Sequence, residues 1–185
     1  MIKKIQFHVK QMEAIKYLKD DKTEVVAYLG RANCGKSYLA CVWLLTNALV
    51  YEGSRGAMCR KLLKNLKGSM LGTFFKVCKE YGLKRGDDFK YNNQDSIIYF
   101  KNGSEIKLVQ LSYEPSDVEG ERFGGLELSY CCIDEISEID KDVYEVIYSR
   151  IRYLDEFGLS KKLLITGNPS DTWTKEYFYT RYIKN

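Results

Sequence analysis

The 185 residues contain no long hydrophobic run, and the first residues do not have the composition expected of a signal-peptide core. Its longest apolar runs, such as residues 40–45, fall far short of the roughly 20 residues that cross a bilayer. Lys3 and Lys4 carry positive charge near the amino terminus. Polar residues interrupt the segment that follows, up to Gln11, so it lacks the apolar core of a signal peptide. These absences predict a cytosolic protein that has no membrane partner.

Metal-ligating patterns are also missing. The six cysteines show no C-x-x-C spacing, and the single histidine, His8, has no companion ligand. Zinc is therefore not expected. Cys131 and Cys132 lie in an apolar segment, where reduced cysteine behaves as a small hydrophobic residue.

Size and composition indicate one globular domain. Hydrophobic residues make up 45% and charged residues 29% of the chain, and no low-complexity tract interrupts it. A chain of this length buries a core of its own. The net charge of +4 is only mildly basic, so charge alone does not identify a nucleic-acid binder.

A phosphate-binding motif is present near the amino terminus. Residues 30–37 match the G-x-x-x-x-G-K-[ST] phosphate loop, or Walker A motif. The apolar run 25–29 precedes the motif and the helix-like segment 38–45 follows it, which is the strand-loop-helix context that the motif requires. The eight residues are Gly30, Arg31, Ala32, Asn33, Cys34, Gly35, Lys36 and Ser37.

The residue types in this loop suit a nucleoside triphosphate. A strand that turns into a helix directs backbone N–H groups and the positive end of the helix dipole at the phosphates. Gly30 and Gly35 allow the backbone to bend closely around them. Lys36 can reach the β- and γ-phosphates, and the Ser37 hydroxyl can ligate Mg²⁺.

A second motif is the hydrophobic segment 130–133 followed by Asp134 and Glu135. Asp134 suits direct or water-mediated binding of Mg²⁺, and Glu135 can orient and polarise the attacking water. An Asp-Glu pair after a strand is often structural by itself. Beside a phosphate loop it indicates hydrolysis by an NTPase more than transfer by a small-molecule kinase.

A third motif is the apolar run 163–165 followed by Thr166, Gly167, Asn168 and Pro169. A polar residue at the tip of such a strand can contact the γ-phosphate or the lytic water and report its loss. The alternative is a Gly-Asn-Pro turn that has no part in chemistry.

Periodicity and turn signals predict an ordered series of elements. Helices are expected over 7–19, after the phosphate loop, and over 62–81, 141–152 and 173–182. Strands are expected over 25–29, 56–60, 128–133 and 163–165, with a hairpin of 96–100 and 105–109 around a tight primed Asn-Gly turn. This order predicts one α/β domain with a mostly parallel central sheet flanked by helices and a β-hairpin insertion. Gly30, Asp134 and Thr166 would then emerge at the carboxyl ends of the strands, where such sheets bind ligands.

Together the three motifs resemble the ATPase domain of the large terminase subunit of tailed bacteriophages, the motor that pumps DNA into a procapsid. The resemblance covers nearly the whole chain. It implies a P-loop NTPase fold of the additional-strand, catalytic-glutamate type over residues 1–185. It also implies ATP hydrolysis that drives translocation of double-stranded viral DNA, with ATP and Mg²⁺ as cofactors.

The resemblance assigns roles to individual residues. It implies that Lys36 and Ser37 bind phosphates and Mg²⁺, that Asp134 holds the metal, and that Glu135 activates water. Thr166 to Asn168 would couple hydrolysis to DNA movement, and Gln11 would recognise adenine. A solvated helix glutamine is the alternative for Gln11.

Arginines in this family complete the site. Many members have an arginine four positions before the loop lysine, whereas Arg31 lies five positions before Lys36, so its role is open. Such motors work as homo-oligomeric rings in which a neighbour's arginine stabilises transition-state charge. Arg122 is the first candidate, and Arg150 and Arg152 come next; an ordinary surface arginine is the alternative.

The implied partners are double-stranded DNA, the portal protein and a small terminase subunit or its equivalent, with the protein docked on the procapsid in the host cytoplasm. A basic series on one predicted helix face could contact DNA phosphates or be merely solvated. The series is Arg60, Lys61, Lys64 and Lys67.

One departure from the family concerns its second domain. Large terminases usually carry a nuclease domain, but only Asp171 and Glu176 follow Pro169 as acids. No nuclease is expected in this chain, so either the polypeptide is truncated or the two activities are separate. The rival functions are another DNA-directed NTPase such as a helicase-like core, and a nucleotide-binding switch without turnover.

Overall fold

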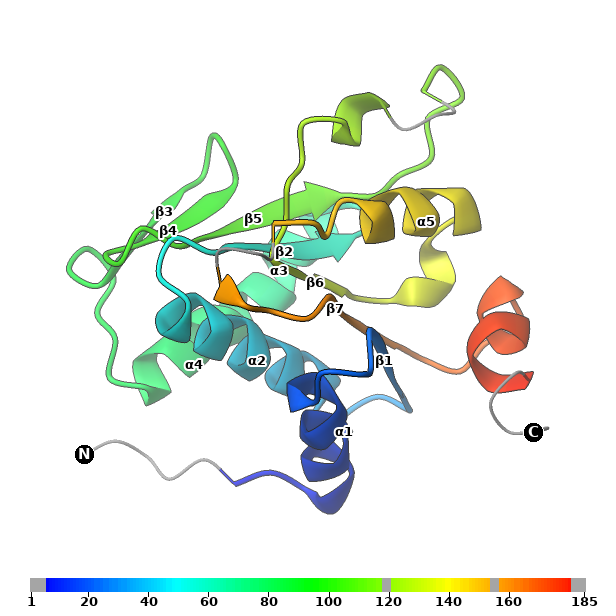
Figure 1. The fold of residues 1–185 in the computed structure, drawn as a ribbon, viewed down its shortest axis with the longest axis horizontal. Coiled ribbons are helices and arrows are strands. Elements are labelled where there is room, and N and C mark those ends of the chain that lie inside the picture. Colours follow the sequence, from blue (N-terminus) through cyan, green and yellow to red (C-terminus); the bar gives the residue numbers. More distant parts are fainter. Residues whose placement is uncertain (1–5, 118–120, 154–156, 181–185) are drawn as a thin grey trace.

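A single mixed sheet organises the chain (Figure 1). The computed structural model describes residues 6–117, 121–153 and 157–180. The strands are β1 (Val25–Leu29), β2 (Arg55–Arg60), β3 (Phe89–Asn92), β4 (Ile97–Phe100), β5 (Glu105–Gln110), β6 (Tyr130–Ile133) and β7 (Lys162–Gly167). They lie in the order β1-β7-β6-β2-β5-β4-β3. The pairs β1–β7, β7–β6, β6–β2 and β2–β5 are parallel, whereas β5–β4 and β4–β3 are antiparallel. The predicted α/β fold class is confirmed.

Helices cover both faces of the sheet (Figure 1). They are α1 (Val9–Lys19), α2 (Lys36–Val50), α3 (Leu63–Gly68), α4 (Met70–Glu80) and α5 (Lys141–Ser149), with short turns η1 (Glu121–Phe123) and η2 (Ile136–Glu138) and a π-helical segment η4 (Lys175–Thr180). α2 and α4 pack on one face, and α5 lies on the other. Within the described ranges, no helix is both long enough and apolar enough to cross a bilayer.

The central strands are apolar because they serve two cores at once. In β6, Tyr130 and Cys132 belong to the core under α2 and α4, while Cys131 and Ile133 belong to the core under α5. All four side chains are buried. Alternating side chains of a strand point to opposite faces, so a strand covered on both faces reads as a continuous hydrophobic run.

One predicted helix is two helices. The segment expected to be continuous over 62–81 breaks at Ser69, which has φ −123° and ψ −75° between α3 and α4. The Ser69 hydroxyl donates to the Asn65 carbonyl at 2.8 Å and accepts from Arg60 Nη1 at 3.0 Å. Its side chain therefore competes with the helical backbone pattern, which serine does readily.

The hairpin is confirmed, but its turn differs from the prediction. A primed Asn-Gly turn needs positive φ at both central residues, whereas only Gly103 has it, at 83°. Asn102 instead donates to the Ala48 carbonyl at 2.8 Å and accepts from Ser104 N at 3.2 Å. These contacts hold the turn on the end of α2. A further antiparallel strand, β3, extends the hairpin and was not predicted.

Candidate functional site

The phosphate loop joins β1 to α2 as predicted. Gly35 precedes α2 in the left-handed region with φ 75°, and Asn33 has φ 65°. Gly30 N donates to the Gly167 carbonyl at 3.0 Å, so the loop begins against the end of β7. The first N–H groups of α2 therefore face the carboxyl edge of the sheet, where an anion is stabilised by the helix terminus.

Lys36 lies folded over this loop and is 8% exposed. Its Nζ donates to the Gly30 carbonyl at 2.6 Å, to the Arg31 carbonyl at 2.9 Å and to Asn168 Oδ1 at 3.2 Å. An ammonium held by neutral carbonyl and amide oxygens can exchange them for anionic phosphate oxygens, which are stronger acceptors. Lys36 and Asn168, which are 132 positions apart in the sequence, thus meet in one site.

Cys34 and Tyr28 hold the phosphate loop in shape through hydrogen bonds to its backbone. The Cys34 thiol donates to the Arg31 carbonyl at 2.9 Å, and a Cβ added at Gly30 would lie 2.8 Å from this sulfur. The Tyr28 hydroxyl donates to the Cys34 carbonyl at 3.3 Å. Burial raises the pKa of Tyr28, so the hydroxyl remains a donor. Gly30 is required here because Cys34 occupies the space of a side chain.

Asp134 lies at the end of β6 and is only 4% exposed. Its Oδ1 accepts from the Thr166 hydroxyl at 2.7 Å, and its Oδ2 lies 3.5 Å from Arg60 Nη1. A buried carboxylate is tolerated because it has a hydrogen bond and a nearby cation. The carboxylate is thus held in place at the strand end.

Glu135 has a strained backbone. With φ 53° and ψ 57° it occupies the left-handed region, which is unusual for a residue other than glycine, asparagine or aspartate. Gly167 packs against this turn, because an added Cβ would lie 3.2 Å from Ile136 N and 3.5 Å from Glu135 Cα. The end of β7 therefore touches both the phosphate loop and the acidic turn.

The other predicted residues vary in their placement. Ser37 lies in the first turn of α2, and Ala32 and Arg31 line a cavity of about 440 Å³ with Asn168 and Pro169. Gln11 is 2% exposed, and its Nε2 donates to the Gly35 carbonyl at 3.0 Å.

Arg122 contacts its own loop. Its guanidinium pairs with Glu114 and, at 3.3 Å, with Asp117, and it donates to the Ser112 carbonyl. It also lies over the Phe123 ring at 4.5 Å. These contacts join Arg122 to the segment between β5 and β6, so its action on a neighbouring subunit stays a prediction.

The remaining arginine candidates lie at the end of α5. Arg152 pairs with Glu127 at 3.4 Å, and Arg150 follows the last residue of the helix. Their action on a neighbour likewise stays a prediction.

Arg60 lies in the candidate site and not on the helix face predicted for it. It was grouped with Lys61, Lys64 and Lys67 on one helix face, but it is the last residue of β2, and Lys61 precedes α3. Its guanidinium faces Asp134 and lies 4.0 Å from Glu138. The grouping is wrong because the helix begins only at Leu63. The available signal was that Arg60 is the last residue of the expected strand 56–60.

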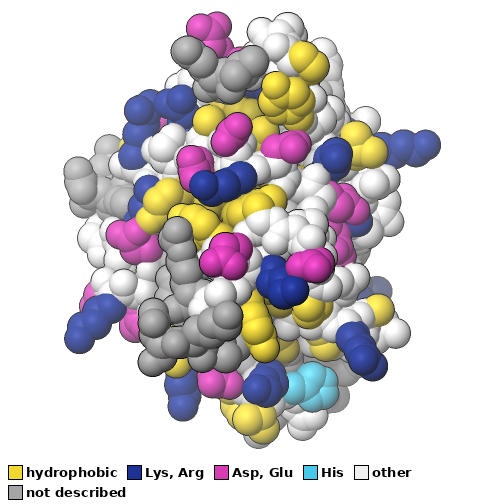
Figure 2. Space-filling view, turned by 90° about the vertical axis from the view of Figure 1, so that its right-hand side faces the viewer, with side chains coloured by type: hydrophobic (Ala, Val, Ile, Leu, Met, Phe, Trp, Pro, Cys, Tyr) yellow, Lys and Arg dark blue, Asp and Glu magenta, His cyan; other side chains and the backbone are white. Residues whose placement is uncertain are grey.

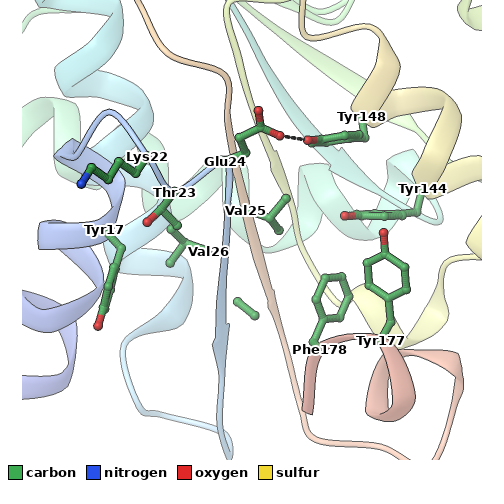
Figure 3. A pocket seen from close by; sticks show the side chains of 11 residues that line it. Tyr17, Lys22, Thr23, Glu24, Val25, Val26, Tyr144, Tyr148, Tyr177 and Phe178 are labelled. Carbon is green, nitrogen blue, oxygen red and sulfur yellow. Dashed lines mark hydrogen bonds between the residues drawn. The ribbon is translucent and has the colours of Figure 1, made fainter. Parts of the chain in front are cut away.

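A second cavity lies elsewhere in the described part of the chain. It measures about 720 Å³ and runs along β1, an edge strand of the sheet (Figure 3). Tyr17 and Lys22 lie on one side and Tyr144 and Tyr177 on the other, while the Tyr148 hydroxyl donates to Glu24. It borders the amino-terminal part of β1, whereas the phosphate loop follows the carboxyl end, so it is separate from the candidate site.

Figure 2 looks onto the right-hand side of Figure 1. Hydrophobic side chains form a broken band there, with acidic and basic side chains among them. Charges of both signs therefore share this face of the molecule.

A family model described as phage terminase large subunit matches residues 21–185. A comparison with curated proteins found no match. The ATP-gamma-S complex of a large terminase from a thermophilic bacteriophage has a TM-score of 0.72 at 16% identity, covering 97% of this chain and 42% of that one. The bacteriophage HK97 large terminase gives 0.67 at 12% identity, covering 88% and 33%. The large terminase ATPase domain of Thermus phage P74-26 gives 0.60 at 15% identity, covering 94% and 69%. These structures share the fold, and the chain spans less than half of the first of these proteins.

Proposed function

Because the chain belongs to the phage terminase large-subunit family, we propose that it hydrolyses ATP to drive double-stranded viral DNA into a procapsid. The observation that carries this proposal is the meeting of three motifs at one edge of the sheet. Lys36 contacts Asn168, Thr166 contacts Asp134, and Gly167 packs against Glu135. A lone phosphate loop would support nucleotide binding only, whereas the added acids support hydrolysis.

The donor set of the site fits magnesium. Mg²⁺ prefers oxygen ligands, and the Ser37 hydroxyl and the buried Asp134 carboxylate are such groups. These two residues would hold the ion, which would supply charge neutralisation at the β- and γ-phosphates. Lys36 binds the phosphates, and Glu135 orients the attacking water and accepts its proton.

The tip of β7 is suited to report hydrolysis. Asn168 Oδ1 accepts from Lys36, and Thr166 donates to Asp134, the acid that would hold the metal. Loss of the γ-phosphate changes the charge that both partners experience, so residues 166–168 shift relative to the loop. This movement would couple ATP hydrolysis to the movement of DNA.

The proposal extends to the assembly in which such a motor works. The chain acts in a homo-oligomeric ring on the portal of a procapsid in the host cytoplasm, with a small terminase subunit or its equivalent. Arg122 of one subunit would complete the site of its neighbour. Relatives such as the large terminase of the thermophilic bacteriophage are more than twice as long as this chain, so DNA cleavage is not assigned to it.

Replacing Glu135 with glutamine separates a motor from a nucleotide switch. Glu135→Gln should lower ATP turnover by about 10²- to 10⁴-fold while ATP affinity stays within about threefold, because only proton transfer is lost. ATPase rates are measured with and without double-stranded DNA and procapsids that display the portal, and affinity is measured by calorimetry. The matched control is Glu145→Gln, an exposed acid on α5 that contacts none of the site residues named here.

Each outcome has a distinct meaning. A switch would show little turnover in the unaltered protein under every condition. Stimulation by DNA without procapsids would favour the helicase-like alternative. Stimulation that needs DNA and portal together supports the packaging motor.

A further inference from the structure

Gln11 is more deeply buried than a solvated helix glutamine would be. It is 2% exposed although its neighbours Lys10, Met12 and Glu13 on α1 are exposed. Burying a carboxamide is unfavourable unless its donor and acceptor find partners. The partners that it has found in the folded chain indicate what it does.

The carboxamide joins the beginnings of two helices. Its Oε1 accepts from His8 N at 2.8 Å, which caps the first turn of α1. Its Nε2 donates at 3.0 Å to the carbonyl of Gly35, the residue that precedes α2. One side chain therefore fixes the phosphate loop relative to α1.

The contact falls on the most constrained residue of the loop. Gly35 has φ 75°, and its carbonyl also accepts the first bond of α2 from Leu39 N at 3.0 Å. A Cβ added at Gly35 would lie only 2.5 Å from Gln11 Nε2. The hydrogen bond therefore needs both the Gln11 carboxamide and a glycine at position 35. Together these two residues fix the direction of the N–H groups of the phosphate loop.

We propose that Gln11 is a positioning residue for the phosphate loop, which sets the affinity for the triphosphate group whatever base is attached to it. The inference rests on the proposed function, since it concerns the same nucleotide site. It assigns to Gln11 a task different from adenine recognition. A base reader affects only adenine nucleotides, whereas a loop clamp affects every ligand that the loop holds.

Ligands that differ only in the base distinguish the two tasks. Affinities of ATP, GTP and inorganic tripolyphosphate, each with Mg²⁺, are measured by calorimetry for the unaltered chain and for Gln11→Ala. We expect all three affinities to fall by a similar factor of about five to ten, because one buried hydrogen bond to the loop is lost. The ratio of ATP to GTP affinity should stay unchanged.

A second variant guards against a general loss of folding. Gln11→Glu keeps an acceptor for His8 N, and so keeps the cap of α1, but it has no donor for the Gly35 carbonyl and adds a negative charge near the phosphates. It should weaken all three ligands at least as much as Gln11→Ala, and affinities are compared at a temperature at which thermal unfolding shows both variants folded, because an unpaired buried carboxylate also lowers stability. The exposed Glu13→Gln on the same helix is the matched control and should change none of the affinities.

The outcomes separate this inference from the proposed function. If ATP affinity falls while GTP and tripolyphosphate bind as before, Gln11 reads the base and the clamp is wrong, but the ATPase proposal stands. If all three affinities are unchanged in both variants, the clamp is also wrong. If the unaltered protein binds none of the three ligands, both proposals fail.

Discussion

Individual polar side chains in the site are buried and hold one another in place. Lys36 has three oxygen partners within 3.2 Å, and Asp134 has Thr166 and Arg60. Buried polar groups with partners stay in fixed positions, because a side chain that moved away would leave a buried donor or acceptor without a hydrogen bond. Contacts within the chain therefore fix the arrangement of the site, and single substitutions should have large effects.

Removal of the loop lysine tests the phosphate site directly. Lys36→Ala should weaken ATP binding by about a hundredfold or more and abolish turnover, because the cation that faces the phosphates is lost. Calorimetry and a phosphate-release assay measure the two effects. Lys90→Ala, at an exposed position of β3, is the control and should leave both unchanged. Normal turnover by Lys36→Ala would refute the site.

The Thr166 hydroxyl can be removed without changing the size of the side chain. Thr166→Val should lower the free energy of unfolding by about 1–3 kcal/mol, because Asp134 Oδ1 loses its donor inside the protein. Thr166→Ser keeps the hydroxyl and should cost less. Urea denaturation measures the difference. Equal losses for the two variants would show that the methyl group matters and the hydrogen bond does not.

Sequence motifs predicted some of these residues and not others. Lys36, Asp134 and Thr166 were predicted because each belongs to a recognisable motif at or just beyond the end of an apolar strand. The contact of Arg60 with Asp134 depends on β2 and β6 being neighbours, a pairing between residues 74 positions apart. The left-handed backbone of Glu135, against which Gly167 packs, also has no local signature in the sequence.

At the scale of elements, the hydrophobic pattern of the sequence predicts whether a segment is a helix or a strand, whereas tertiary packing determines where the segment begins and ends. The near-continuous apolar strands β6 and β7 were predicted because burial on both faces leaves a clear run. The break between α3 and α4 was not, since it depends on the contact of Ser69 with Arg60. Likewise, the conformation of the turn at Asn102 depends on the hydrogen bond from Asn102 to the Ala48 carbonyl of α2. Rules based on the turn sequence alone do not predict such a long-range contact.

Glycines in two elements should respond oppositely to an added methyl group. Gly56 in β2 is buried, and a Cβ there would lie 2.4 Å from the Tyr130 ring. Gly56→Ala should therefore lower the free energy of unfolding by about 1–3 kcal/mol. Gly72 in α4 is exposed, and a Cβ added there would have no atom within 4 Å apart from the backbone of its own helix. Gly72→Ala should therefore raise the free energy of unfolding by about 0.5–1 kcal/mol. Chemical denaturation of both variants measures the pair, and a neutral Gly56→Ala would contradict the packing.

Across the whole molecule, a polar junction ties the loop between α1 and β1 to the last strand, β7. Lys162 at the start of β7 is 6% exposed, and its Nζ donates to Asp20 Oδ1 at 3.1 Å. Asp20 also accepts from the Thr23 backbone N at 2.6 Å and from the Thr23 hydroxyl at 2.7 Å. The loop before β1 is thereby joined to β7, which positions the two strands that carry the phosphate loop and residues 166–168.

This junction should make stability depend on pH. Hydrogen bonds from Thr23, and secondarily from Lys162, hold the pKa of Asp20 in the folded protein far below its ordinary value of 3.8. The unfolded chain therefore takes up a proton near pH 4 that the folded protein does not. The stabilisation is complete above that pH and declines as the pH falls below it toward the lowered pKa.

Comparison with Asp20→Asn isolates this contribution, because asparagine does not titrate. The unaltered protein should have the higher thermal midpoint at pH 7, and its advantage over Asp20→Asn should shrink as the pH is lowered from about 5 to about 3. Thermal unfolding followed by circular dichroism measures both midpoints across that range. Asp21→Asn, at the exposed neighbouring position, should show no such narrowing. An advantage of Asp20 that stays constant with pH would mean that the junction acts through shape rather than through charge.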